Sequence, residues 1–382
     1  MAVNQTQVKA RVIQGNEAMV EGAIAAGCRF FAGYPITPAS EIAELMSRRM
    51  PEVGGTFLQM EDEIASISAV MGAVWGGVKA CTASSGPGIS LMQETVGWGA
   101  VTDTPCVIMN VMRGGPSTGQ PTIASQQDVY QAKYGSHGDY EIIALAPSSV
   151  QEAYELTIKA FNLAEIYRVP VYVLSDEVVG HTREKVRLGG DVEVVERRAP
   201  DPEGYLPFKA GPDGLLPGMP AFNQGYRLLV DGQLHGEDGN RVGADPVQSG
   251  RLVHRLCHKI TDHVDEITDV EALHTEDAEV AIVAYGSVAR PAMEAVMQAR
   301  KQGLKAGILR LRVLWPFPDQ VVQDLASRAH TIYVPEMNIG KICREVRRAV
   351  DGAARVIPVP RLGGIMHTPA EILQLIQEGV RG

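Results

Sequence analysis

Apolar positions recur along this chain with two alternating periods, one typical of buried strands and one typical of helices. Short runs rich in β-branched and aromatic residues predict strands, and longer runs with apolar residues three or four apart predict helices. In the first half, strands are expected at 29–33, 56–60, 79–84, 105–112, 141–147 and 170–177. Helices are expected at 15–27, 39–50, 61–78, 86–102 and 149–167. Strands that alternate with helices in this way predict an α/β protein with a doubly wound parallel sheet.

The pattern changes twice further along the chain. From 188 to 250 the periodicity gives way to a segment crowded with proline and glycine, which we interpret as a crossing between domains that Tyr205, Phe208 and Phe222 hold in order. A helix at 249–267 then opens a second α/β unit, which is smaller than the first. We expect three parts: a doubly wound domain at 1–187, the crossing segment at 188–250, and a second domain at 251–382.

Composition narrows the class of protein. Hydrophobic residues make up 45% and charged residues 21% of the 382 positions, as in an ordinary soluble globular protein. The net charge of −10 argues against a nucleic-acid partner. No apolar stretch reaches the ~20 residues that a membrane span needs. We therefore expect a cytoplasmic protein without nucleic-acid or membrane contacts.

The cysteines agree with this interpretation. They are Cys28, Cys81, Cys106, Cys257 and Cys343. None lies within four residues of another, so the chain has no zinc or iron–sulfur ligand run, and we expect no metal site in it. An odd number of cysteines without a secretory signal is typical of reduced, mostly buried thiols in a cytosol.

The first candidate for chemistry is the stretch GYPITPASEI at 33–42, where a strand turns into a helix. Proline fixes φ and removes a backbone donor, so the YPITP segment is expected to be a stiff, extended turn. Open α/β sheets bind ligands outside the carboxyl ends of their strands. This loop therefore lies where a ligand is expected.

Three acids, Glu61, Asp62 and Glu63, begin a helix that carries no charge from Ile64 to Val78. A helix without a polar face is expected to be buried on all sides, and its small residues permit close packing against another element or another chain. The acids are explained simply as partners of the helix dipole. A carboxylate at the buried end of such a helix would instead have a raised pKa and would be able to share a proton with a ligand nitrogen.

Three further features are open to two interpretations each. The segment TASSGPG at 82–88 turns a strand into a helix through small residues, which suits an anion or a plain helix cap. Arg113 lies at the end of a buried strand, before a glycine-rich, flexible loop. It is interpreted either as a clamp for a carboxylate or as a surface arginine that pairs with an acid. His137 lies in the loop YGSHGDYE, where an ordinary loop histidine is the simpler explanation.

Taken together, FAGYPITPASEIAE, QMEDEIAS, TASSGPG, RGGPSTGQPT and LWPFP, in this order, resemble the α subunits of 2-oxoacid:ferredoxin oxidoreductases, most of all those that act on 2-oxoglutarate. The resemblance covers nearly the whole chain. It implies that the first domain is the pyrimidine-binding domain of a thiamine diphosphate enzyme, and that the second is similar to the C-terminal domain of transketolases. The implied reaction is the oxidative decarboxylation of 2-oxoglutarate to succinyl-CoA and CO₂, or its reverse, with electrons passed to ferredoxin.

The resemblance also assigns roles to residues. Glu63, which has Gly72 nine positions later, is implied to hydrogen-bond N1′ of the aminopyrimidine, with Glu61 as the reserve choice. Thr37 is implied to lie beside the substrate and the thiazolium, and Arg113 to clamp the C1 carboxylate of the 2-oxoacid. The remaining implied contacts are Pro35, Ile36, Ser85 and Gly86 for the cofactor and His137 for the substrate.

What the chain lacks predicts its partners. Thiamine enzymes anchor the diphosphate through Mg²⁺ with a Gly-Asp-Gly motif and a later asparagine, and the stretch GEDGN at 236–240 does not have that form. The resemblance therefore implies a β subunit that binds the diphosphate, Mg²⁺ and a 4Fe–4S cluster. It also implies coenzyme A as co-substrate, ferredoxin as acceptor, a separate γ subunit, and a ferredoxin-like δ subunit as an open alternative.

Three alternatives stay open at this point. The same chemistry on branched-chain 2-oxoacids or pyruvate is compatible with the core motifs. A cation that binds the distal carboxylate would favour 2-oxoglutarate, and the sequence offers only His137 and Arg183 as candidates for it. A catalytically silent scaffold that only docks the β subunit is less consistent with Glu63, Thr37 and Arg113. A nicotinamide-binding Rossmann enzyme is disfavoured, since no Gly-x-Gly-x-x-Gly motif follows a strand.

Overall fold

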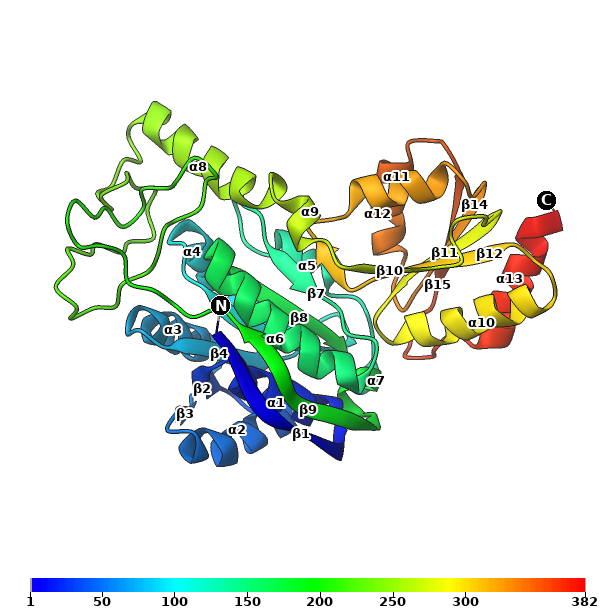
Figure 1. Ribbon diagram of the computed structural model, residues 1–382, viewed down its shortest axis with the longest axis horizontal. Coiled ribbons are helices and arrows are strands. Elements are labelled where there is room, and N and C mark those ends of the chain that lie inside the picture. The colour runs from blue at the N-terminus through cyan, green and yellow to red at the C-terminus, as the bar shows by residue number, and fades with distance from the viewer. Residues whose placement is uncertain (1, 382) are drawn as a thin grey trace.

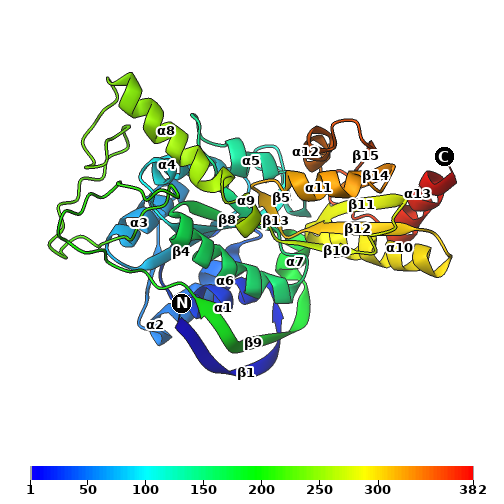
Figure 2. The ribbon, with the colours of Figure 1, turned by 45° about the horizontal axis from the view of Figure 1, so that its top comes forward.

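The computed structural model describes residues 2–381, and side-chain burial for residues 8–380. The chain forms two lobes, each built around a mostly parallel sheet with helices on its faces (Figures 1 and 2). The strands of the first lobe are β2 (Cys28–Gly33), β3 (Thr56–Gln59), β4 (Lys79–Ser84), β5 (Cys106–Gly114), β6 (Gln120–Ala124), β7 (Ile143–Leu145) and β8 (Pro170–Asp176). Its helices are α1 (Gly15–Ala25), α2 (Ser40–Glu52), α3 (Glu63–Trp75), α4 (Pro87–Val101), α5 (Val129–Tyr134), α6 (Val150–Tyr167) and α7 (Glu177–His181).

The first sheet has the order β13-β7-β8-β5-β4-β2-β3, in which β13 (Val313–Trp315) comes from the second half of the chain, and β6 pairs only with β5. The pairs from β7 to β3 are all parallel, which confirms the doubly wound sheet that the periodicity predicts. The central strands β4, β5 and β8 are buried along their whole length because helices cover both faces.

Helix α3 differs from its prediction. Its inner face is buried through Ser66, Ile67, Val70, Met71 and Val74, but Ile64, Ser68 and Gly72 are exposed. The expectation that this uncharged helix is buried on all sides is therefore wrong for the chain by itself. The exposed face consists of small and apolar residues, as in a surface that packs closely against another chain.

A two-stranded antiparallel ribbon lies outside both sheets. It is formed by β1 (Ala2–Gln14) and β9 (Arg183–Val194), with Gln14 opposite Arg183 and Ala2 opposite Val194. The two strands run side by side along the first lobe in both ribbon views (Figures 1 and 2). The sequence did not indicate β9, and the expected boundary at 187 falls inside this strand, so the crossing segment begins after Val194.

The crossing segment is ordered against the first lobe. Phe208 is buried and its ring lies 3.8 Å from the His235 ring, and the Phe222 amide donates to the Trp75 carbonyl (2.9 Å). Helix α8 (Pro246–Thr261) follows, and its Lys259 forms an ion pair with the buried Asp103. The expectation that this helix opens the second unit is wrong, because α8 packs on the first lobe.

The second lobe has a five-stranded sheet with the order β10-β12-β11-β14-β15. Its strands are β10 (Val270–Leu273), β11 (Val280–Tyr285), β12 (Ala306–Leu311), β14 (Thr331–Glu336) and β15 (Arg355–Pro360). Its helices are α9 (Val264–Ile267), the 3₁₀ turn η1 (Gly286–Val288), α10 (Ala289–Lys301), α11 (Asp319–Ala326), α12 (Lys341–Val350) and α13 (Pro369–Arg381).

One strand from the second half of the chain belongs to the first sheet. After β12, the chain forms β13 (Val313–Trp315), which pairs antiparallel with β7. The Trp315 indole N–H donates to the Val129 carbonyl (2.8 Å), and Arg310 forms an ion pair with Glu152 (2.6 Å). The two lobes therefore share a sheet edge and a continuous core.

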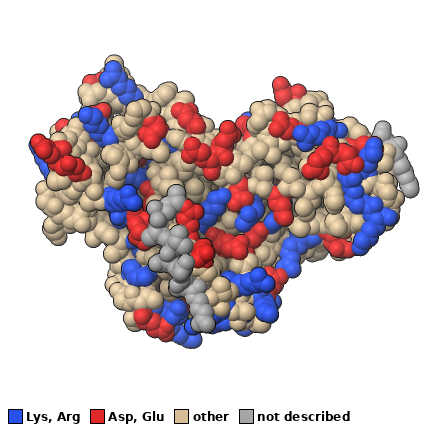
Figure 3. Space-filling model, viewed as in Figure 1, with Lys and Arg blue, Asp and Glu red and all other residues tan. Residues whose placement is uncertain are grey.

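The surface carries both signs of charge. On the face drawn in Figure 3, Lys and Arg lie interspersed with Asp and Glu on both lobes. Within residues 2–381, we find no helix that combines the length and apolarity required to cross a bilayer.

Candidate active site

The candidate site lies at the carboxyl ends of three parallel strands of the first sheet. Strands β2, β4 and β5 end at Gly33, Ser84 and Gly114; Thr37 follows β2, whereas Ser84 and Arg113 are among the last residues of β4 and β5. Glu63 follows β3, the neighbour of β2. Parallel strands bring such ends to one edge, where open α/β sheets bind ligands. The structure thereby brings together residues as distant in sequence as Thr37 and Arg113, which are 76 positions apart.

The three acids before α3 have three different environments. Glu61 is exposed, and the Asp62 carboxylate caps the helix by accepting from the Ala65 amide (2.7 Å). Glu63 is the first helical residue and its side chain is buried, with 5% of its surface exposed. The Ser84 hydroxyl donates to the Glu63 carboxylate (3.2 Å). Glu63 is thus the only one of the three whose carboxylate is enclosed at the strand ends.

Small residues of the next turn leave room around Glu63. A Cβ atom on Gly88 would lie 2.3 Å from Glu63 Oε1 and 2.1 Å from Ser84 Oγ, so a side chain there would displace the carboxylate. Gly86 has φ +46°, which favours glycine, and it precedes α4. The predicted cofactor contact Ser85 is buried, but its hydroxyl donates to the Val111 carbonyl (2.7 Å). The hydroxyl that reaches Glu63 belongs to Ser84, which the sequence analysis did not single out.

Arg113 lies on the other side of the Gly86 turn. Its guanidinium donates to the Thr37 carbonyl (2.6 Å) and to the Thr118 carbonyl (3.0 Å), and it is 5% exposed. Its Nε atom is buried and, among the described residues, has no hydrogen-bond partner. Burial lowers the pKa of Arg113, and the nearby charges of Asp128 and Glu63 oppose that change. The guanidinium is held by backbone carbonyls while it keeps donor capacity for a ligand.

The YPITP loop stands over this edge. Pro35 and Thr37 are exposed and Ile36 is half-buried, and the backbone carbonyl of Thr37 is tied to Arg113. The next carbonyl, that of Pro38, accepts from the buried Asn16 amide (2.9 Å). The stiff turn predicted from its prolines is therefore also fixed at its base by two side chains.

The loop after Arg113 is more regular than expected. Residues 120–124 form β6, which pairs antiparallel with β5 through Arg113 opposite Ala124 and Gly114 opposite Gln120. The expected flexible loop is thus a hairpin with its turn at 115–119. This pairing fixes the backbone on both sides of the guanidinium.

The two remaining substrate candidates lie elsewhere. His137 is exposed and lines a cavity of about 380 Å³ with Trp98, Tyr140 and Leu234, behind α4. Arg183 starts β9, in the ribbon. The structure brings neither of them to Arg113.

The structure instead reveals a cavity of about 730 Å³ beside Arg113, between the lobes. Residues from β5, α4 and the start of α5 form one wall, and Asn338, Ile339 and Lys341 of the second lobe form the other. The Asp128 carboxyl also lines it, and burial raises the pKa of that carboxyl. The sequence gives no signal for this wall, because Lys341 is 228 positions from Arg113 in the chain.

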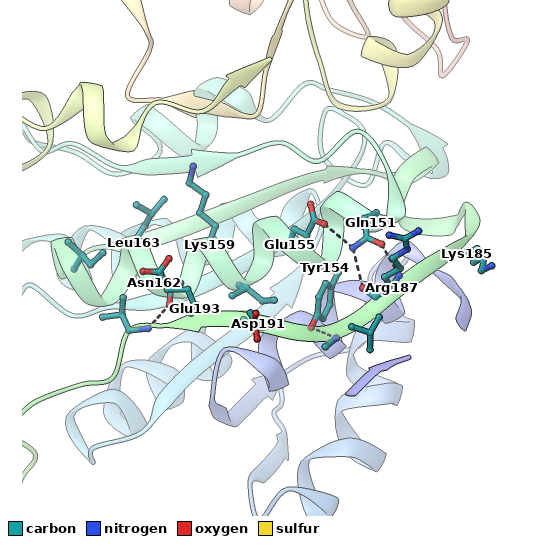
Figure 4. A pocket seen from close by; sticks show the side chains of 16 residues that line it. Gln151, Tyr154, Glu155, Lys159, Asn162, Leu163, Lys185, Arg187, Asp191 and Glu193 are labelled. Carbon is teal, nitrogen blue, oxygen red and sulfur yellow. Dashed lines mark hydrogen bonds between the residues drawn. The ribbon is translucent and has the colours of Figure 1, made fainter. Parts of the chain in front are cut away.

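A larger groove of about 940 Å³ lies between α6 and the β9 ribbon (Figure 4). Its polar side chains connect the helix to the ribbon: Tyr154 accepts from the Gly189 amide (3.0 Å), and Asn162 donates to the Glu193 carbonyl (2.8 Å). These contacts fasten β9 to the lobe. The groove contains none of the residues of the candidate site.

Comparison with known proteins gives this geometry a context. The family model "Pyruvate flavodoxin/ferredoxin oxidoreductase, thiamine diP-bdg" matches residues 21–252, which include the whole candidate site. The chain belongs to the 2-oxoacid:ferredoxin oxidoreductase family. A second model of the same family, "Pyruvate:ferredoxin oxidoreductase core domain II", matches residues 278–372 of the second lobe. The first lobe is therefore a thiamine diphosphate-binding domain of this family.

Relatives within the family span the same length. The 2-oxoglutarate synthase subunit KorA of Methanothermobacter thermautotrophicus is 54% identical over 366 residues, which are 95% of this chain and 97% of the relative. The KorA subunit of Methanocaldococcus jannaschii is 51% identical over 96% of this chain and 98% of the relative. The ketoisovalerate oxidoreductase subunit VorB of Methanothermobacter marburgensis is 36% identical over 96% and 97%.

Solved structures agree on the fold. The 2-oxoglutarate:ferredoxin oxidoreductase of Magnetococcus marinus, solved with 2-oxoglutarate, coenzyme A and succinyl-CoA bound, matches 97% of this chain at 31% identity and a TM-score of 0.91. This chain spans 65% of the length of that one. A split-gene transketolase matches 96% of both chains at 13% identity and a TM-score of 0.54, so the shared feature is the fold.

Proposed function

We propose that this chain is the α subunit of a 2-oxoglutarate:ferredoxin oxidoreductase, which forms succinyl-CoA and CO₂ from 2-oxoglutarate and coenzyme A or runs in reverse. The observation that carries the proposal is the enclosed Glu63 carboxylate at the same strand ends as Thr37 and Arg113. The identity of 45–54% to 2-oxoglutarate synthase subunits of four organisms, against 36–37% to ketoisovalerate oxidoreductase subunits, favours 2-oxoglutarate.

The residues at this edge fit thiamine diphosphate. The buried Glu63 carboxylate lies against Gly88, where an added Cβ would be 2.3 Å from its Oε1, and it has one hydrogen bond within the chain. Glu63 would hold the pyrimidine end of the cofactor, and Ser84, Gly86 and Ile36 would surround it. The bound cofactor supplies the carbon nucleophile and the electron sink for decarboxylation.

The chain's own residues then have separate tasks. Glu63, the first residue of a helix that carries no other charge, places a buried carboxylate with one hydrogen bond within the chain where it can hydrogen-bond a ring nitrogen. Arg113 binds and orients a carboxylate, because its guanidinium is already held by the Thr37 and Thr118 carbonyls. The Thr37 hydroxyl, on a loop fixed at its base, lines the same approach.

The proposal requires a second subunit. Among residues 2–381, no group of three or more His, Cys, Asp and Glu side chains is placed to hold a metal ion. We therefore assign the diphosphate site, Mg²⁺ and the 4Fe–4S cluster to a β subunit, with γ, δ and ferredoxin as further partners. Large apolar side chains stand exposed around the site, which suits such a docking face: Tyr34, Leu58, Ile64 and Leu91.

The test is an assay of the complex purified with its native partners. Reduction of ferredoxin or a dye acceptor is measured with CoA across 2-oxoglutarate, pyruvate and a branched-chain 2-oxoacid. The highest kcat/KM is expected for 2-oxoglutarate. A higher value for the branched-chain acid would select the runner-up, and no reduction with any 2-oxoacid would leave the scaffold interpretation.

A further inference from the structure

The cavity between the lobes carries a second cation opposite Arg113. Its lining holds three charged side chains, those of Arg113, Asp128 and Lys341. Arg113 comes from β5 of the first lobe, and Lys341 is the first residue of α12 in the second lobe. Two cations and one carboxyl leave a net positive charge in a cavity of about 730 Å³, and cations on opposite walls suit a small ligand with an anionic group at each end.

The position of Lys341 is fixed by a buried polar network. The Asn338 side chain accepts from the amides of Gly340 (2.8 Å) and Lys341 (2.9 Å), and donates to the Gln126 carbonyl (2.7 Å). The carboxylate of Glu336 accepts from the two amides that follow Lys341. The first turn of α12 is thereby attached to the first lobe beside α5, as the α5–α12 contact in Figure 2 illustrates.

One residue connects the two cations. The Gln127 carbonyl accepts from the Lys341 ammonium (2.5 Å), and the Gln127 side chain accepts from the Gly115 amide (2.9 Å), two positions after Arg113. An ammonium has three N–H donors, so two remain for a ligand. Among the described residues, Lys341 forms no ion pair, although burial lowers its pKa. The carboxyls of Asp128 and Glu336 oppose that change but form no ion pair with Lys341, so it is a positioned cation with unoccupied donors.

We infer that Lys341 binds the distal carboxylate of a dicarboxylic 2-oxoacid, while Arg113 binds the carboxylate next to the keto group. The inference rests on the proposed function and deepens it, because it names the residue that distinguishes 2-oxoglutarate from apolar 2-oxoacids. The same ammonium has the chemistry to meet a phosphate of coenzyme A. The test below distinguishes the carboxylate of the 2-oxoacid from the phosphate of coenzyme A as the group that Lys341 binds.

The test uses the complex with its native partners and three variants of this chain. Lys341→Met removes the charge, and Lys341→Arg keeps it. Arg344→Met removes an exposed cation one turn along α12 that does not line the cavity. Steady-state rates are measured for 2-oxoglutarate and for 2-oxopentanoate, which has a methyl group in place of the distal carboxylate. The Kd of 2-oxoglutarate without CoA is measured by calorimetry.

For Lys341→Met, kcat/KM for 2-oxoglutarate should fall about 10- to 100-fold, as expected for one hydrogen bond to a charged group. The value for 2-oxopentanoate and the KM for CoA should stay within a factor of about three, which is less than the loss of one such bond. The Kd of 2-oxoglutarate should rise in parallel with the loss of kcat/KM. Lys341→Arg should recover most of the loss, and Arg344→Met should behave as the unmodified complex.

Three results would overturn the inference: an unchanged preference between the two acids, an equal loss for both, or a rise in the KM for CoA alone. The last would assign the ammonium to a phosphate of CoA. If the unmodified complex reduces no acceptor with any 2-oxoacid, the proposed function fails and this inference fails with it. An active complex whose Lys341→Met variant keeps its preference refutes the inference alone.

Discussion

Two buried polar clusters of the first lobe use their charges in opposite ways. At Asp103 both carboxylate oxygens are occupied, by Arg255 (2.5 and 3.0 Å) and Lys259 (2.6 Å), and the Asp103 carbonyl accepts from Arg168 (3.0 Å). At Glu63 the carboxylate has one hydrogen bond, from Ser84 at 3.2 Å. The Asp103 carboxylate is fully paired within the chain, whereas the Glu63 carboxylate leaves capacity for a further hydrogen bond.

The electrostatics of the Asp103 cluster follow from this pairing. Burial opposes ionisation of Asp103, but the charges of Arg255 and Lys259 outweigh it and hold the pKa of that carboxyl below its ordinary value. Burial also lowers the pKa of Lys259, to about 8, against the attraction of Asp103. A buried carboxylate whose oxygens are all paired within the chain indicates a structural role, whereas a buried carboxylate with few partners indicates a role in binding a ligand. The predictions below test this division.

The largest expected effect is on stability. Asp103→Asn leaves Arg255, Lys259 and Arg168 buried without their anion, and breaking a buried pair in this way costs about 3–5 kcal/mol. The free energy of unfolding is measured by urea denaturation. As a control, Glu279→Gln removes an exposed partner of Lys305 and should leave the stability unchanged. Equal losses for both variants would contradict the assignment of Asp103 as a structural anchor.

The next effect is on activity alone. Glu63→Gln keeps size and hydrogen-bonding capacity but removes the acid, so turnover of the complex should fall by about 10²-fold or more, the range of a general acid–base group. Assembly and urea stability should be unchanged, because Glu63 contributes one hydrogen bond within the chain. Unchanged turnover would favour the scaffold interpretation.

A smaller effect is expected from filling the space beside Glu63. In Gly88→Ala the new Cβ would lie 2.3 Å from Glu63 Oε1, so the carboxylate must shift, and we expect about a tenfold loss of turnover, equivalent to about 1.4 kcal/mol. The matched control is Gly72→Ala in α3, where nothing lies within 4 Å of the added Cβ. That control should keep or raise the stability of the isolated chain, since alanine favours a helix interior over glycine. Full activity of Gly88→Ala would show that the carboxylate needs no fixed position.

The smallest effect is a pH dependence. Because the folded-state pKa of Asp103 is depressed, its stabilisation is present above the unfolded value of 3.8 and is lost as the pH falls through the folded value. The difference in stability between the unmodified chain and Asp103→Asn should therefore shrink as the pH falls below 3.8. A difference that already shrinks at pH 5 would contradict a depressed pKa.

Most of the fold was predictable from sequence because it rests on local periodicity. All the strands from β2 to β8 except β6 were indicated, as were the helices α1 to α4 and α6 between them. The ribbon strands β1 and β9 were missed because they pair with each other across 169 or more positions, and no local pattern reports such a partner. The exposed face of α3 was misjudged because small residues look alike whether they face a core or a partner.

The candidate site was predictable in part. Glu63, Thr37 and Arg113 are found at adjoining strand ends, which follows from their motifs and the rule for parallel sheets. Sequence could not decide which of Ser84 and Ser85 faces Glu63, because neighbouring strand residues point to opposite faces. Nor could it place Lys341 near Arg113, since only the packing of the two lobes brings them into one cavity.

The short strand Val313–Trp315 limits how this chain can be divided. It completes the first sheet from the second half of the sequence by covering the edge of β7. A protein cut within the crossing segment would not yield two independent modules, because its N-terminal piece would display the bare edge of β7, open to pairing with any passing strand. Because each lobe depends on the other in this way, we expect the two lobes to be inherited as a single unit.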